Sequence, residues 1–215
     1  MKIGLTYDLR SEYLALGYSH EATAELDSEA TVSALDRTLQ TLGHQTDRIG
    51  HLRQLTTRLA AGDRWDLVFN ICEGMHGLSR ESQVPALLEG WQIPCTFSDS
   101  FTMAVCLHKG LTKAILERAG LATAAFCVVE SAADIPKVQM PWPLFVKPVA
   151  EGTGKGVSAA SVVRSAAELE DAGEREEVDL RHQPPQLRGD RRRAIRSEEH
   201  TSELQSRFGI SYAVF

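Results

Sequence analysis

The stretch Asp66-Leu67-Val68-Phe69-Asn70-Ile71 is apolar at nearly all of its central positions. This pattern is typical of a strand in a parallel sheet whose two faces are both covered by helices. Two other short stretches ahead of it, Lys2–Tyr7 and Gln45–Ile49, also have the composition of strands. The chain therefore begins with three predicted strands.

Helical patterns separate these strands. Ser28 can cap a helix whose apolar residues recur at helical spacing, and Gly43 can end that helix as a C-terminal glycine cap. A second helix is expected from about His51 to Ala61. The alternation of strand and helix predicts an α/β fold with a parallel, doubly wound sheet.

A loop rich in glycine and charge, Glu73 to Arg80, follows the third strand and leads into a helix. Loops at the carboxyl ends of parallel strands are where such folds bind ligands. Ile93–Thr96 is predicted as another short strand, and helices are predicted over about Ser100 to Ala119.

The next part of the chain predicts a different arrangement. A strand is expected within Ala122–Val129, and a helix begins at about Ala166. Phe145–Lys147 and Val157–Ala160 flank a glycine-rich stretch and are predicted to form a hairpin with that stretch at its tip. Lys113, within the preceding helix, is expected on a solvated face.

Composition excludes several classes of function. The chain is 43% apolar and 24% charged and carries a net charge of -6, which argues against a non-specific nucleic-acid binder. No stretch approaches the roughly 20 apolar residues of a membrane span, and the N-terminus lacks the apolar segment of a signal peptide. A cytoplasmic location without nucleic-acid or membrane partners is the expectation.

The character of the sequence changes after about Ala172. Between Gly173 and Arg207 there are six apolar residues and sixteen charged ones. Such a segment buries too little apolar surface to offset its ordering entropy, so a disordered tail is expected over 173–215. Arg196–Phe215 resembles the translation of a sequencing-library adapter, and no function is assigned to residues after about 172.

Two lysines and a glycine-rich stretch form the clearest candidate for chemistry: Lys109, Lys147 and Glu151–Ser158. A nucleoside triphosphate needs positive charge near its phosphates and main-chain amides that can approach them. The Walker spacing and the dinucleotide GxGxxG pattern are both absent. By itself, the glycine-rich stretch is also compatible with an ordinary turn.

Four ordered blocks carry a family resemblance: FNICEGMHG, SQVPALLEGWQIPCTFSD, HKGLTKAILERAGL and PLFVKPVAEGTGKGVS. They are similar to the D-alanine–D-alanine ligase branch of the ATP-grasp superfamily, over about Met1 to Glu170. The resemblance implies a Rossmann-like pre-ATP-grasp domain over 1–102. It further implies a partial ATP-grasp small subdomain of the α+β type over 103–172.

The resemblance also implies roles for particular residues. Lys109 and Lys147 match the family's two phosphate-binding lysines, and Glu29 matches the acidic residue for the first amino acid's ammonium group. The loop that closes over the triphosphate corresponds to Glu151, Gly152, Thr153, Gly154, Lys155 and Gly156. Glu73 and His76 are candidates for substrate contact, although solvated loop side chains explain them equally well.

Several positions depart from the family pattern. His108 stands where Asp is usual before the first lysine, and Glu73-Gly74 stands where His-Gly is usual. Thr153 and Gly154 replace paired serines. These changes predict a divergent subgroup and leave D-alanine open as the substrate.

The implied reaction joins two small amino-acid substrates through an acyl phosphate, with ATP and Mg²⁺ as cofactors. The family's magnesium ligands come from a C-terminal half that this sequence does not match, so the chain as written is expected to be inactive. Two alternatives remain: a non-catalytic Rossmann-like binding module, and an ATP-grasp ligase for other amino acids. The resemblance also implies a homodimer through the N-terminal domain.

Overall fold

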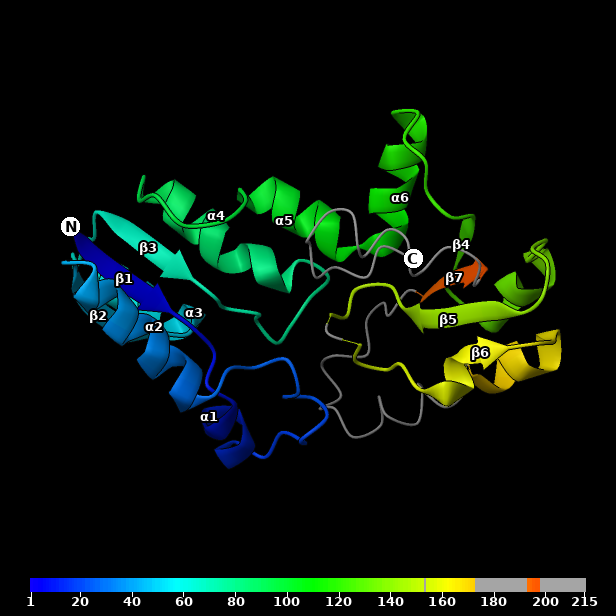
Figure 1. Cartoon of the computed structure of the whole chain (residues 1–215), viewed down its shortest axis with the longest axis horizontal. Helices are drawn as coiled ribbons and strands as arrows, with labels where there is room; N and C mark the ends of the chain where they lie inside the picture. The colour runs from blue at the N-terminus through cyan, green and yellow to red at the C-terminus, as the bar shows by residue number, and fades with distance from the viewer. Residues whose placement is uncertain (153, 173–192, 198–215) are drawn as a thin grey trace. The chain divides into compact units, whose positions relative to one another are not determined.

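The computed structural model describes residues 1–152, 154–172 and 193–197. Its contacts divide the chain into two compact units, Met1–Ala104 and Val105–Phe215. Both units mix helices and strands, as expected for an α/β chain (Figure 1). No helix in the described ranges is both long and apolar enough to cross a membrane.

The first unit contains a parallel three-stranded sheet of order β2-β1-β3. Its strands are β1 (Lys2–Thr6), β2 (Gln45–Gly50) and β3 (Leu67–Asn70). Its helices are α1 (Arg10–Ala15), α2 (Glu29–Thr41), α3 (Leu52–Ala60), η1 (Arg80–Ser82), α4 (Gln83–Gly90) and α5 (Ser100–Leu107), the last ending beyond Ala104.

The strands and helices of this unit follow the sequence pattern closely. The side chain of Ser28 caps α2 by accepting a hydrogen bond from the amide of Thr31, and Gly43 follows the helix with φ +87°. The predicted strand at Ile93–Thr96 is reduced to an isolated parallel bridge between Cys95 and Val68. Helix α1 is an addition that the sequence did not indicate.

Two apolar clusters cover the two faces of this sheet. On one face, nine buried residues from the sheet, α3, α4 and adjoining segments form the larger cluster: Ile49, Leu55, Leu59, Trp65, Val68, Cys72, Val84, Leu88 and Ile93. On the other face, Leu5 and Tyr7 pack with Val32 of α2. The loop that follows β3 carries the polar candidates Glu73 and His76.

The second unit holds a four-stranded sheet of order β4-β7-β5-β6. Its elements are α6 (Lys109–Arg118), β4 (Phe126–Val129), η2 (Ala132–Lys137), β5 (Leu144–Pro148), η3 (Ala159–Ser161), β6 (Val162–Val163), a helix over 166–172 and β7 (Arg193–Ser197). The core of this unit joins β4, β5 and β6 to η2 and the helix over 166–172, through Val129, Ile135, Leu144, Val146, Val163 and Leu169.

One expectation for this unit was wrong in detail. The hairpin partner of β5 is β6, not Val157–Ala160, because the 158–161 segment turns into η3 with Ser158 as its cap. The expected disordered tail lies mostly outside the described residues, but Arg193–Ser197 forms β7 and pairs antiparallel with both β4 and β5. Main-chain hydrogen bonding between strands needs no apolar composition, so composition alone does not exclude such a strand.

Candidate functional site

The loop after β3 carries a largely buried carboxyl group. Glu73 lies three residues beyond Asn70, the last residue of β3. The pKa of Glu73 is raised to about 8, mainly by burial and further by the negative charges of Glu81 and Glu25. The guanidinium of Arg80 acts in the opposite direction. This carboxyl group therefore holds a proton more readily than an exposed glutamate does.

A buried ion pair lies next to it. Arg80 Nη2 is 2.9 Å from Glu25 Oε2 and 3.5 Å from Glu81 Oε1, and all three side chains are at least 88% buried, their relative exposures being 7%, 4% and 12%. Arg80 therefore pairs with two buried carboxylates, and the charges of all three residues act on Glu73. Nearby negative charge favours a bound proton on a buried carboxyl group, or a positively charged ligand beside it.

Sequence reasoning missed Glu25. Its buried partner, Arg80, lies 55 positions later in the chain, and no local periodicity relates the two. The one available signal was the unusual density of acidic residues between Glu21 and Glu29.

His76 lies in the same loop as Glu73 and contacts a different part of the chain. The Tyr18 hydroxyl is 3.2 Å from His76 Nε2, and the Gln83 side chain donates to the His76 carbonyl oxygen at 2.8 Å. The segment that follows α1 is therefore joined to this loop twice, through Tyr18 and through Glu25. His76 and Glu73 remain neighbours in one loop, as the sequence predicts.

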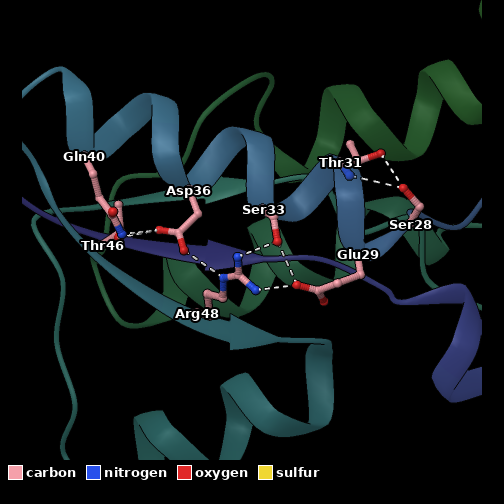
Figure 2. A network of polar contacts seen from close by, with 8 residues as sticks. All are labelled: Ser28, Glu29, Thr31, Ser33, Asp36, Gln40, Thr46 and Arg48. Atoms are coloured by element: carbon pink, nitrogen blue, oxygen red, sulfur yellow. Dashed lines mark hydrogen bonds and ion pairs between the residues drawn. The ribbon is translucent and has the colours of Figure 1, made fainter.

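Glu29 occupies a different environment (Figure 2). Its carboxylate accepts from Arg48 Nη1 at 2.6 Å and from the Ser33 hydroxyl at 2.8 Å, and Arg48 Nε also donates to Asp36 at 2.8 Å. These contacts lower the pKa of Glu29, with the Arg48 hydrogen bond as the largest cause. Arg48 therefore already neutralises this exposed carboxylate. Within the described residues, the hydrogen-bond partners of Glu29 come from α2 and β2 and not from the loop of Glu73.

In the second unit, Lys109 meets the glycine-rich stretch. Lys109 is the first residue of α6, and its ammonium group donates to the carbonyl oxygen of Glu151. Its amide donates to the carbonyl oxygen of Val149 at 2.9 Å. Lys155 Nζ lies 3.0 Å from Glu151 Oε2. Two lysines 46 positions apart therefore converge on one residue, Glu151.

Lys147 lies on β5, two residues before the segment that Lys109 contacts, and its side chain is buried. Beyond it the chain turns sharply. Gly154 and Gly156 have positive φ values of +78° and +71°, and the Lys155 amide donates to the Gly152 carbonyl at 2.9 Å. Thr153, also predicted for this site, lies outside the described residues. Glycines in this conformation leave main-chain amides accessible to an anion.

Lys113 contradicts the expectation of a solvated lysine. Its side chain is 4% exposed, its ammonium group donates to the Thr123 hydroxyl at 2.6 Å, and it lies 5.2 Å from the centre of the Phe126 ring. Two large apolar residues of α6, Leu111 and Ile115, are each 47% exposed, and the charged residues Glu117 and Arg118 at its end are exposed as well. Among the described residues, no group of three or more His, Cys, Asp or Glu side chains is arranged to hold a metal ion.

Comparisons with known proteins give a consistent result. No family model matches the chain. The D-alanine–D-alanine ligase of Rhizorhabdus wittichii is 31% identical over 154 residues, covering 72% of this chain and 47% of that protein. The chain spans about half the length of the curated relatives it matches.

The solved structures that resemble it share the fold. The D-alanine–D-alanine ligase of Bacillus anthracis superposes with a TM-score of 0.64 at 21% identity, covering 93% of this chain and 58% of that one. A structure of the same ligase complexed with ATP gives a TM-score of 0.57 at 19% identity, with 93% and 59% coverage. The N-terminal part of this chain therefore belongs to a D-alanine–D-alanine ligase-like family.

Proposed function

We propose that this chain is part of an ATP-dependent carboxylate-amine ligase, in which the second unit binds the nucleotide and the first unit binds an amino acid. The observation that carries the proposal is the convergence of Lys109 and Lys155 on Glu151, beside the glycine turn that follows Lys147. That arrangement has no counterpart in an ordinary hairpin tip, which needs no lysine from a helix about 40 residues earlier.

The donor groups of the second unit fit a triphosphate. Lys109, Lys147 and Lys155 supply positive charge, and the glycine turn supplies amides without side chains in the way. Phosphate oxygens would replace the Glu151 oxygens as acceptors for two of these ammonium groups. When bound, ATP supplies the phosphoryl group that converts a substrate carboxylate into an acyl phosphate, from which a second substrate's amine displaces phosphate.

Positive charge aimed at the transferring phosphoryl group is the contribution expected of these lysines. The glycine turn, 151–156, would exclude water from the reacting groups. Mg²⁺ belongs to the proposal as a cofactor of the complete ligase, and we assign none of its ligands to the described residues.

In the first unit, the loop of Glu73 and His76 is proposed to bind an amino acid through its ammonium group. Glu25 fits this role better than Glu29, because Glu25 is buried beside Glu73 whereas Glu29 is exposed and paired with Arg48. The substrate class is small amino acids. Since Glu73 and His108 depart from the family pattern, amino acids other than D-alanine are the second candidate.

The proposal includes a cytoplasmic protein that forms a homodimer through its first unit. A non-catalytic Rossmann-like binding module is the competing function, and it would account for the first unit alone. Nucleotide binding separates the two. A binding module has no need of the lysines in the second unit.

The test is a titration of the 215-residue chain with ATP, monitored by calorimetry, for the unaltered protein and for Lys109→Met and Lys147→Met. We expect each substitution to weaken ATP binding about tenfold or more, since each removes a charge-assisted contact. Lys137→Met is the matched control, because the Lys137 side chain is 73% exposed and pairs with Asp134 within its own turn. No detectable ATP binding by the unaltered chain would refute the proposed nucleotide site in the second unit. ATP turnover by this chain is expected to be absent.

A further inference from the structure

Asp8 is a buried carboxylate at the end of the first strand. It lies two residues after β1, and its side chain is almost fully inaccessible, with the residue 2% exposed. The Tyr13 hydroxyl donates to Asp8 Oδ1 at 2.6 Å, and the Gly74 amide donates to Asp8 Oδ2 at 2.9 Å. Burial and this hydrogen bond raise the pKa of Tyr13, so the phenol remains a donor. Both oxygens of Asp8 are therefore used.

The main chain of Asp8 fixes a second segment. The Asp27 amide donates to the Asp8 carbonyl oxygen at 3.0 Å, and the Arg10 amide donates to the Asp27 carbonyl oxygen at 3.0 Å. Leu9 and Asp27 form a parallel bridge. Glu25 lies two residues before Asp27, so the position of Glu25 is set close to Asp8.

Gly74 carries the link to Glu73. Its φ is +67°, and a Cβ atom there would lie 2.7 Å from the carbonyl oxygen of Arg80. The main chain at Gly74 is therefore in direct contact with the main chain of Arg80, whose side chain pairs with Glu25. Glu73 is the residue immediately before this contact.

Asp8 thus contacts both acidic segments. Its carbonyl oxygen binds the segment that carries Glu25, and its carboxylate binds the loop that carries Glu73. We propose that Asp8 is a positioning residue that sets the separation of the Glu25 and Glu73 carboxyl groups, and through it the affinity for an amino acid's ammonium group. The inference rests on the proposed amino-acid site. It assigns to Asp8 no contact with the ligand, because its two oxygens are occupied by Tyr13 and Gly74.

The alternative is that Asp8 only stabilises the fold. The two roles differ in what a substitution that preserves shape should do. In Asp8→Asn the remaining oxygen can accept from the Gly74 amide while the new amide group donates to the Tyr13 oxygen. In Asp8→Ala the Gly74 amide loses its acceptor. Positioning therefore predicts that Asn preserves ligand affinity and that Ala does not.

The experiment is a titration of the 215-residue chain with D-alanine, L-alanine and glycine, followed by amide chemical shifts, with ATP affinity measured in parallel. We expect Asp8→Ala to lower the affinity for whichever of these amino acids the unaltered chain binds best, by about tenfold or more. The amino-acid affinity of Asp8→Asn should stay within about threefold of that of the unaltered chain. Neither should change ATP affinity. The Gly74 amide should lose hydrogen-exchange protection in the Ala variant and keep it in the Asn variant.

Asp47→Ala is the control for a purely structural loss. Asp47 lies on β2, where it pairs with Arg58 at 2.6 Å and accepts from Trp65, so its removal should lower stability without changing amino-acid affinity. If Asp8→Ala does not fold, Tyr13→Phe replaces it, since that change removes the hydrogen bond from Tyr13 to the Asp8 carboxylate and leaves the one from Gly74. We then expect a loss of about threefold in amino-acid affinity.

Each other result has a defined meaning. Unchanged amino-acid affinity in Asp8→Ala overturns the inference, and the same holds for Tyr13→Phe if that variant has to be used instead. A loss of affinity in Asp8→Asn equal to that in Asp8→Ala also overturns it. An equal loss in Asp47→Ala also overturns it, because general destabilisation would then explain the effect. If the unaltered chain binds ATP but none of the amino acids, the proposed amino-acid site fails, and this inference fails with it.

Discussion

Arg80 and Glu25 form an ion pair of 2.9 Å between side chains that are 7% and 4% exposed. Arg80 also lies 3.5 Å from Glu81, so one guanidinium serves two carboxylates. Glu73 is a third acidic group in the same place. The negative charges of Glu81 and Glu25 therefore favour a bound proton on Glu73, or a cationic ligand beside it.

Glu73→Gln should change how stability depends on pH. The folded-state pKa of Glu73 is about 8, against an ordinary value of 4.5. The folded chain therefore binds more protons than the unfolded chain between these values, and the stabilisation that is full below about pH 4.5 is lost as the pH rises to about 8. Gln stays neutral, so its advantage in unfolding free energy should grow by up to about 1.4 kcal/mol per pH unit across this window.

The measurement is urea unfolding of both proteins from about pH 5 to about pH 9. Glu21→Gln, at an exposed position in the same unit, should show no such growth. A constant difference between Glu73→Gln and the unaltered chain would show that the Glu73 carboxyl is ionised throughout this range.

Gly74→Ala should be more damaging than Gly77→Ala, although both glycines have positive φ. The φ values are +67° and +93°, and placing alanine in this region costs about 1 kcal/mol in either case. The added Cβ lies 2.7 Å from the Arg80 carbonyl oxygen at position 74, but 3.8 Å from its nearest neighbour at position 77. We expect a further loss of about 1–3 kcal/mol for Gly74→Ala alone, measured by chemical unfolding. Equal losses of unfolding free energy in the two variants would mean that the main chain at Arg80 shifts to make room for the added Cβ at no cost.

The start of α2 could be predicted from sequence because its signals are local. Ser28 caps the helix through the Thr31 amide, and Gly43 ends it with a positive φ. The parallel sheet was predictable for a similar reason, since the apolar centre of β3 requires cover on both faces. Its parallel pairing with β1 confirms that prediction.

The parts that failed depend on distant partners. Glu25 is distinguished from other acidic residues by its buried ion pair with Arg80, 55 positions later. Three positions of α6 depart from the usual pattern, since Lys113 is 4% exposed while Leu111 and Ile115 are each 47% exposed. Periodicity identifies apolar positions. It cannot show that a buried lysine donates a hydrogen bond to Thr123 and lies over the Phe126 ring.

Asp36→Asn should lower stability more than Glu29→Gln, although both residues contact Arg48 (Figure 2). The Asp36 side chain is 15% exposed and the Glu29 side chain 58%. Hydrogen bonds from Thr46, and then from Arg48, lower the pKa of Asp36 despite its partial burial. Asp36→Asn should therefore cost about 1 kcal/mol near neutral pH.

The pH dependence of that loss follows from the direction of the shift. A lowered pKa contributes stability above the unfolded value of 3.8, and this stability is lost as the pH falls through the folded value. The difference between Asp36→Asn and the unaltered chain should shrink below about pH 4.

The effect of Glu29→Gln should be small and should decrease with added salt, because that pair is exposed. A salt-independent loss in Glu29→Gln would contradict this interpretation.

Gly110→Ala tests whether the close approach of α6 to β4 sets the position of Lys109. A Cβ on Gly110 would lie 2.4 Å from Val128 Cγ2 and 3.4 Å from His108 Cε1. Alanine is otherwise favoured over glycine in a helix by about 1 kcal/mol, so any net loss of stability reports the clash. We expect a net loss of about 1–3 kcal/mol and weaker ATP binding, because the first turn of α6 must move and it carries Lys109.

Val128→Ala removes the methyl group that the new Cβ would meet. Alone it should cost about 1 kcal/mol by leaving a small cavity, without changing ATP affinity. Combined with Gly110→Ala, it should restore both stability and ATP affinity toward those of the unaltered chain, giving a favourable coupling of about 1 kcal/mol or more in a double-mutant cycle. Additive losses would mean that Val128 does not limit the approach, and that Lys109 is held by its bonds to Val149 and Glu151 alone.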